Sequence, residues 1–186
     1  MKSLIFSIVL ITVFTMKAQD KLPYYEIPEA AKEFTPGTTV SRMIDGLGFR
    51  YYWATEGLTE KDLAFKPNAE ARTTLETINH ILGLSKVILN ATSNTPNHPK
   101  QRKLSFAEKR KITLMNLHKA SKRLRKIKDI SEYKMKFLTT EYPFWNVING
   151  PIADAIWHTG QVVSFRRSSG NPFPKGVSVL RGTKSE

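Results

Sequence analysis

The sequence contains no cysteine among its 186 residues. This absence excludes disulfide bonds, thiolate metal sites and a cysteine nucleophile. It also excludes an exported lipoprotein, because the lipid of such a protein is attached to a cysteine. Any metal site in this chain must therefore be built from nitrogen and oxygen donors.

The chain also lacks an apolar run that is long enough for a membrane-spanning helix. The uncharged run at 4–16 has 13 residues, whereas a spanning helix needs about 20. A lysine precedes this run, and Ala18 follows it at the position of a cleavage site. We interpret 1–18 as a cleavable signal peptide, which predicts a secreted or periplasmic protein. Met16 matches the usual small residue poorly, so the sequence defines the cleavage position less sharply than the signal. A retained N-terminal anchor is the alternative interpretation.

Acidic residues are scarce relative to basic ones. The chain has 29 Lys and Arg residues against 16 Asp and Glu, a formal net charge of +13. Removal of 1–18 takes away two lysines and leaves 27 basic against 16 acidic residues, a net charge of +11. Such an excess predicts attraction to anionic lipid, polysaccharide or nucleic acid, of which nucleic acid fits an exported protein least.

The sequence shows no internal repeat, no low-complexity segment and no long alternation with period two. Apolar residues instead recur every three or four positions in four stretches, which indicates amphipathic helices. These stretches run over about 40–57, 73–90, 105–127 and 151–168. Four such helices in succession predict an all-α fold, a four-helix bundle.

Capping residues mark the ends of the predicted helices. The starting signals are Thr38 or Thr39, Thr73 with Glu76, Ser105 with Glu108, and Pro151 as a first-turn proline. The stopping signals are Gly57 and the segment Gly170-Asn171-Pro172. The chain therefore divides into a signal peptide at 1–18, an extended leader at 19–37, the bundle at 38–172 and a C-terminal tail at 173–186.

Asp154 and His158 lie four residues apart on the last predicted helix, so their side chains share one face. The neighbouring residues are mostly apolar, which predicts that the pair lies inside the bundle, where a charge requires a partner or a metal. Asp154 also lies in the predicted first turn, where the positive helix end favours a carboxylate. An exposed, hydrogen-bonded Asp–His pair is the alternative interpretation.

His80 lies in the middle of the helix predicted over 73–90, which is apolar around most of its circumference. A bundle can turn this side chain toward Asp154 and His158. Two imidazoles and one carboxylate suit one divalent ion of zinc, iron, manganese or nickel, with coordination positions left open. The alternative is a core histidine that is hydrogen-bonded to a backbone carbonyl.

Three segments of the sequence carry a family resemblance: Asn79-His80-Ile81-Leu82, Asp154-x-x-x-His158-x-Gly160-Gln161 and Arg166-Arg167-x-x-Gly170-Asn171-Pro172. Together they resemble the DinB-like (DinB/YfiT) metalloprotein superfamily over about residues 38–172. The resemblance implies a four-helix bundle in which His80 and the Asp154–His158 pair hold one divalent metal. Asp154 departs from the family, which usually has a histidine there, and carboxylate is a harder ligand than imidazole. Some relatives are thiol-dependent transferases.

Other residues are candidates for supporting roles. Gln161, one turn after His158, is a candidate partner of the metal ligands or a packing residue. Arg166 and Arg167 lie in the last turn, where they complement the helix dipole and could receive an anionic substrate. We expect Trp53, Trp145 and Trp157 to be core or pocket residues, and His98 and His118 to be solvated.

The helix predicted over 105–127 carries many lysines and arginines on one face. A solvated surface is the simplest interpretation, and docking to an acidic surface is the alternative. Two functions follow for the whole protein. The first is a metal-dependent transferase or hydrolase, which would use a thiol or water on an unknown small substrate. The second is a non-catalytic metal- or anion-binding protein. The sequence does not specify the oligomeric state, and a dimer is compatible with it.

Overall fold

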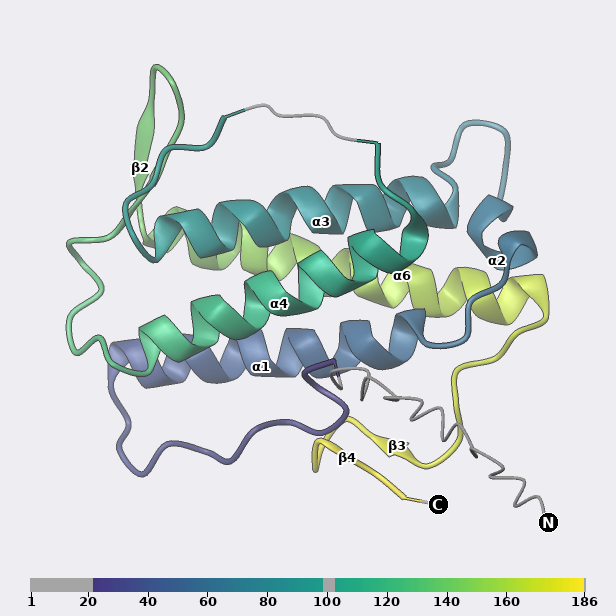
Figure 1. The fold of residues 1–186 in the computed structure, drawn as a ribbon, viewed down its shortest axis with the longest axis horizontal. Coiled ribbons are helices and arrows are strands. Elements are labelled where there is room, and N and C mark those ends of the chain that lie inside the picture. The colour runs from purple at the N-terminus through teal and green to yellow at the C-terminus, as the bar shows by residue number, and fades with distance from the viewer. Residues whose placement is uncertain (1–21, 99–102, 186) are drawn as a thin grey trace, which may run out of the picture.

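The computed structural model describes residues 22–98 and 103–185, and the predicted signal peptide lies outside these ranges. The described part is mostly helical, as the sequence predicts. It contains four long helices, α1 (Pro36–Thr55), α3 (Thr74–Ala91), α4 (Phe106–Leu124) and α6 (Ala153–Ser169). Helix α1 packs against α4 and α6, and α3 packs against the same two helices, so each long helix has two long neighbours (Figure 1).

The starts of α3 and α4 agree with the capping signals. Thr73 and Ser105 are the N-caps, and each forms a reciprocal capping box with a glutamate three residues later. The start of α1 differs, because Thr35 caps it and Pro36 occupies the first helical turn. The prediction of a cap at Thr38 or Thr39, and of a leader that ends at 37, was therefore wrong. A proline has the backbone angle of a first helical residue, so Pro36 begins the helix.

A short helix, α2 (Glu60–Ala64), lies in the segment that was expected to be an irregular connector. Its N-cap is Thr59, and the side chain of Asp62 accepts a hydrogen bond from the Thr59 backbone N–H at 2.8 Å. The pair forms a capping box with aspartate in place of glutamate. This turn brings Asp62 to the end of α6.

The last helical segment begins earlier than predicted. A short helix α5 (Trp145–Val147) continues through a π-helical turn η1 (Ile148–Ile152) into α6. Pro151 therefore lies inside a helical stretch and not at its start. The N–H of Ala153 already donates to Ile148, so Asp154 does not face a free helix end. The argument that a helix dipole favours its ionised form was wrong.

Two small antiparallel sheets were not expected from the sequence. Strand β1 (Lys134–Lys136) pairs with β2 (Glu141–Pro143), and β3 (Val177–Ser178) pairs with β4 (Thr183–Lys184). Strands of two or three residues are too short to produce a recognisable alternation. Among the described residues, no helix has the length and apolar character needed to cross a membrane.

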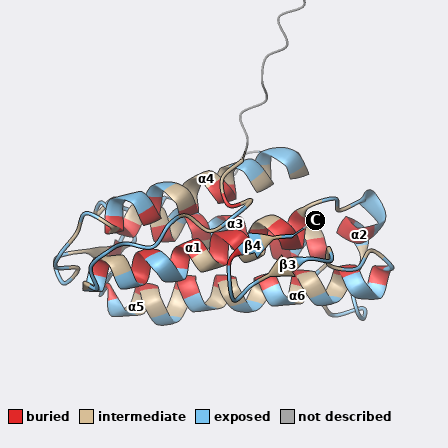
Figure 2. Ribbon diagram, turned by 90° about the horizontal axis from the view of Figure 1, so that it is seen from below, coloured by how far each residue is buried: buried red, intermediate tan, exposed pale blue. Residues whose placement is uncertain are grey.

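The core lies between the four long helices (Figure 2). Its fully buried side chains include Ile44, Leu47, Ile78, Ile81, Ile88, Leu114, Leu117, Leu124 and Ile152. The leader also contributes to the core, because Tyr24 is buried and donates a hydrogen bond to the buried Asp45 at 3.1 Å. Arg125 pairs with the other oxygen of Asp45 at 2.7 Å. Arg125, the C-cap of α4, also donates to the carbonyl of Glu29 at 2.9 Å, so the leader is joined to both α1 and the end of α4.

Candidate metal centre

His80 of α3 meets Asp154 and His158 of α6, as the sequence predicts. The Nε2 atom of His80 lies 3.0 Å from Asp154 Oδ2, and the Nε2 atom of His158 lies 3.3 Å from Asp154 Oδ1. One potential ligand atom from each residue lies within 4.8 Å of the others. The two imidazole rings are nearly perpendicular, with centroids 4.6 Å apart. The three residues could therefore hold a metal ion.

The position of the cluster differs from the prediction of an interior site. The side chains of His80 and Asp154 are 34% and 33% exposed, and that of His158 is 15% exposed. The residues of α6 that face the core are Ala155, Thr159 and Val162. Asp154 immediately precedes Ala155, and His158 immediately precedes Thr159. Both therefore lie at the edge of the buried face of α6, where α6 packs against α3. The cluster is therefore open to solvent.

Gln161 orients the imidazole of His158. Its amide is placed with Oε1 2.7 Å from His158 Nδ1, so that Nδ1–H donates to this oxygen. The Nε2 atom then faces Asp154 Oδ1 at 3.3 Å. A nitrogen and a carboxylate oxygen that face each other in this way require a proton or a cation between them. In metal sites, a hydrogen bond at one ring nitrogen fixes the other nitrogen as the ligand, which is the arrangement found here.

The donor spacing fits a small divalent ion. Metal–ligand bonds of about 2.0–2.1 Å in a tetrahedral site place neighbouring donor atoms about 3.3 Å apart. The two nitrogen–oxygen separations, 3.0 Å to Asp154 Oδ2 and 3.3 Å to Asp154 Oδ1, are each close to that value, at different oxygens of the carboxylate. Three protein donors leave one tetrahedral position for another ligand. The exposure of His80 and Asp154 places that position toward solvent.

An exposed aromatic side chain adjoins the cluster. Trp157 is 71% exposed, and its ring is nearly parallel to that of His158 with centroids 6.4 Å apart. Trp145 is also exposed, at 75%, whereas Trp53 is buried. The core interpretation is correct for Trp53 and wrong for Trp145 and Trp157. A molecule bound at the exposed side of the cluster would therefore lie next to the indole ring of Trp157.

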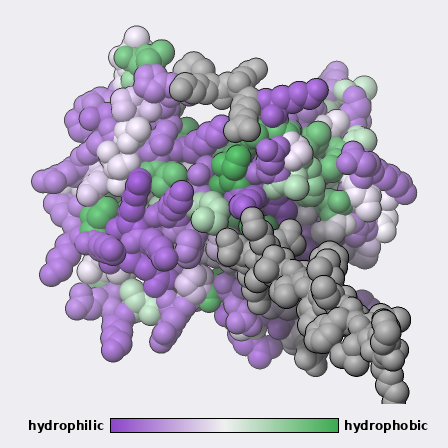
Figure 3. Space-filling model, in the orientation of Figure 1, coloured by the Kyte–Doolittle hydropathy of each residue, from purple (hydrophilic) through white to green (hydrophobic). Residues whose placement is uncertain are grey.

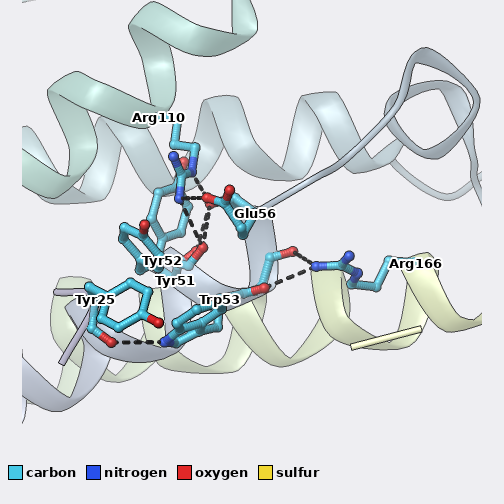
Figure 4. A network of polar contacts seen from close by, with 9 residues as sticks. Tyr25, Tyr51, Tyr52, Trp53, Glu56, Arg110 and Arg166 are labelled. Atoms are coloured by element: carbon cyan, nitrogen blue, oxygen red, sulfur yellow. Dashed lines mark hydrogen bonds and ion pairs between the residues drawn. The ribbon is translucent and has the colours of Figure 1, made fainter. Parts of the chain in front are cut away.

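Arg166 does not serve the anion-binding role considered for it. Its side chain is buried, with 2% of the residue exposed, and Nη1 donates to the carbonyls of Trp53 and Ala54 at 2.9 and 3.1 Å (Figure 4). Its Nε donates to the carbonyl of Asn171 at 2.9 Å. Burial lowers the pKa of this guanidinium. The hypothesis was wrong because the donors are occupied by the end of α1, whereas Arg167 is exposed.

Asp62 belongs to the same cluster as Arg166 and was not recognised from the sequence. It is 1% exposed and accepts hydrogen bonds from Ser169 and from Asn171 Nδ2, the latter at 2.7 Å. Burial raises the pKa of this carboxyl, but the hydrogen bonds from Asn171, Ser169 and Thr59 outweigh burial and lower it below its usual range. The spacing of Thr59 and Asp62 was the available signal.

The two remaining histidines lie apart from the cluster. His98 is exposed, as predicted. His118 is half-buried, and its ring contacts the ring of Tyr24 edge-on with centroids 5.8 Å apart. Burial and the nearby Lys122 lower the pKa of His118. The expectation of a solvated His118 was therefore wrong, because the leader covers it.

The basic face of α4 is only partly a free surface. Arg110 lies over the ring of Tyr52 at 4.5 Å and pairs with Glu56 (Figure 4). Arg123 donates to Ser93 at 3.0 Å. Lys119, Lys122 and Lys126 are exposed. The face of the molecule seen in Figure 3 is largely hydrophilic.

Comparison of the chain with protein-family models, with curated proteins and with solved structures gives no match in any of the three.

Proposed function

We propose that this chain is an exported, DinB-like metal-binding protein in which His80, Asp154 and His158 hold one divalent ion. The observation that carries the proposal is the convergence of two imidazole nitrogens on one carboxylate, at 3.0 and 3.3 Å. These residues come from separate helices, 74 positions apart for His80 and Asp154. Export follows from the sequence of residues 1–18.

The arrangement of the helices supports the DinB-like part of the proposal. The family places one metal ligand on the second long helix and a pair, four residues apart, on the fourth. Here α3 and α6 are the second and fourth long helices of the described chain. Asp154 replaces the usual first histidine of the pair. A carboxylate between two imidazoles suits zinc, iron(II), manganese or nickel, among which the donor set does not discriminate.

We infer that the site is enzymatic, and that it acts as a metal-dependent transferase or hydrolase on a small substrate. A bound divalent ion would supply the activation of a thiol or water at the open position. His80, Asp154 and His158 would hold the ion, and Gln161 would orient His158 through its 2.7 Å contact. Trp157 would offer an apolar wall to the organic part of a substrate.

The test of the metal site is elemental analysis of the purified protein, together with thermal melts before and after treatment with a chelator. We expect close to one divalent ion per chain and a lower melting temperature after stripping, because the ion binds the folded site and not the dispersed ligands. The triple variant His80→Ala, Asp154→Ala, His158→Ala should lose the ion. Retention of wild-type metal content by this variant would place the metal elsewhere and end the proposal.

A non-catalytic role is the second candidate. Three cavities of about 620, 400 and 400 Å³ are each lined by residues other than the metal ligands, so none of these cavities serves the metal centre. The exposed lysines of α4 would then dock the protein to an acidic surface. Turnover of model electrophiles by the metal-loaded protein, with thiol or water as nucleophile, distinguishes this role from the enzymatic one.

A further inference from the structure

The C-terminal tail borders an open cavity on the side of α6 that faces away from the metal centre. The cavity has a volume of about 400 Å³ and is lined by residues of α1, α6 and the tail. Its apolar lining comes from Ile156, Val163, Phe173 and Val179. Gly160 also lines it and lies two residues after His158, which is about 200° around the helix. The cavity and the metal centre are therefore separate sites on one helix.

The charged residues that line this cavity are both arginines, Arg50 and Arg167. The cavity of 620 Å³ has both signs of charge, with Glu56 and Glu108 beside Arg110. The third cavity is lined by Glu33 and by two arginines that already have partners. Arg42 donates to the carbonyl of Pro28 at 2.8 Å, and Arg125 pairs with Asp45. Of these three cavities, the one behind α6 is the one whose lining has arginines and no acidic residue, so its charge complements an anion.

Both arginines have donors to spare. Among the described residues, Arg50 donates one hydrogen bond, from Nη1 to the carbonyl of Gly46 at 3.0 Å. Gly46 permits this position, because a Cβ atom there would lie 3.2 Å from Nη1. Arg167 is exposed, and its side chain donates no hydrogen bond to the described residues. The adjacent Arg166 shows the contrast, since it donates to four carbonyl oxygens of the protein.

We propose that this cavity binds a small organic anion that combines a carboxylate with a short aliphatic chain. The guanidinium groups of Arg50 and Arg167 pair with the carboxylate, for which their planar donors are suited. The chain of the ligand contacts the apolar lining between α6 and the tail. A cavity of this size falls within the range of small-molecule sites, in which apolar walls accompany a few polar anchors. Inorganic phosphate offers nothing to the apolar walls.

The test uses octanoate as the probe and follows binding by calorimetry and by amide NMR of the purified protein. We expect saturable binding that shifts the amide signals of Gly160 and Val163. The double variant Arg50→Gln, Arg167→Gln should bind about tenfold more weakly or worse, because it loses charge-assisted hydrogen bonds. Arg72→Gln, a change of an exposed arginine that does not line the cavity, should bind as the wild type does.

A second variant blocks the cavity without removing a charge. A Cβ atom at Gly160 has no neighbour within 4 Å, so Gly160→Leu places its side chain in open space that borders the cavity. Leucine is also a better helix former than glycine, which protects the fold. Gly83→Leu is the matched control, because Gly83 is equally open, lies in α3 and does not line the cavity. We expect loss of octanoate binding in the first variant alone.

Four results would overturn the inference. These are octanoate binding that the arginine changes leave unaltered, inorganic phosphate or octanol binding as tightly as octanoate, unchanged binding in Gly160→Leu, and signals that shift around His158 instead of Val163. His158→Ala separates this site from the metal centre: it should abolish metal binding and leave octanoate binding intact. Loss of octanoate binding in that variant would mean that the carboxylate binds at the metal centre.

Discussion

Two polar clusters on α6 differ in how completely their groups are satisfied. At the end of the helix, Asp62 and Arg166 are 1% and 2% exposed, and their hydrogen bonds are made within the protein. Near its start, the side chains of His80 and Asp154 are about one third exposed, and the Nε2 atom of His158 lies 3.3 Å from a carboxylate oxygen of Asp154. The groups of the closed cluster bind other groups of the protein, whereas the open cluster has ligand atoms that a cation could bind.

The same difference separates two adjacent arginines. Arg166 fastens the end of α1 to the end of α6, and Arg167 points to a cavity with its donors free of described partners. Both residues are arginines, and they are neighbours in the sequence. Burial and the occupation of donors therefore distinguish structural groups from binding groups in this protein.

The largest expected effect is on stability at the closed cluster. Arg166→Leu should destabilise the fold by about 3–5 kcal/mol, because it leaves buried carbonyls unpaired and removes the cation near Asp62. Unfolding in urea measures this cost. Arg167→Leu is the matched control and should change the free energy of unfolding by about 0.5 kcal/mol or less. Equal costs for the two changes would remove the distinction between them.

The next effect concerns metal affinity at the open cluster. His158→Ala should weaken binding by about 100-fold or more, which exceeds the usual cost of losing a group that only supports a ligand. Asp154→Asn should cost less, because the amide retains an oxygen donor. Competition with a chromophoric chelator measures both, and His98→Ala and His118→Ala should leave affinity unchanged. A larger loss for Asp154→Asn would assign the dominant donor to the carboxylate.

A fall in pH should lower the stability that the closed cluster provides, because Asp62 becomes protonated. Its pKa is lowered in the folded state, so its contribution to stability is complete above the unfolded value of about 3.9 and is lost as pH falls toward the folded value. Asp62→Asn should therefore cost about 2 kcal/mol at neutral pH. The difference from the wild type should shrink below about pH 4. A cost that is independent of pH would show that packing, and not charge, is responsible.

A smaller effect is expected at Gln161. Gln161→Leu removes the acceptor at His158 Nδ1 and should weaken metal binding by about tenfold. Gln161→Glu keeps an acceptor at the same position and should preserve affinity. Titration of both variants with the same metal provides the comparison. Wild-type affinity in Gln161→Leu would mean that the glutamine only packs against the histidine.

The smallest effect is expected on the basic surface. Lys119→Glu with Lys122→Glu should lower the salt concentration at which the protein elutes from a polyanionic resin, since exposed charges are strongly screened. Each exposed pair contributes about 1 kcal/mol or less. Lys61→Glu with Lys175→Glu makes the same change of charge away from α4. Equal shifts in the two double variants would indicate that net charge alone governs retention.

Local signals predicted the helices where capping and periodicity agree. Thr73 and Ser105 mark the starts of α3 and α4, and Gly170, with a φ of 98°, ends α6 in the left-handed conformation that glycine favours. The start of α1 was missed because Pro36-Gly37 also fits a turn. Periodicity gives no indication that Tyr24 of the leader enters the core.

The sequence predicted which residues form the candidate metal site, but it did not predict how far these residues are buried. A spacing of four residues places Asp154 and His158 on one helix face whatever surrounds them. Whether that face is buried depends on the rotation of α6 about its axis, which the neighbouring apolar residues did not determine. The role of Arg166 was unpredictable for a related reason, because its acceptors lie more than 100 residues away in sequence.

The π-helical turn η1 determines the direction in which each later side chain of α6 points around the helix axis. A π turn takes in one residue more than an α turn does, and each residue advances an α-helix by about 100°. Loss of one residue between Ile148 and Ile152 would turn Asp154 and His158 away from His80 together, without altering either side chain. In a set of homologous chains, the number of residues in this turn would therefore indicate whether the site is assembled, as surely as the ligands themselves.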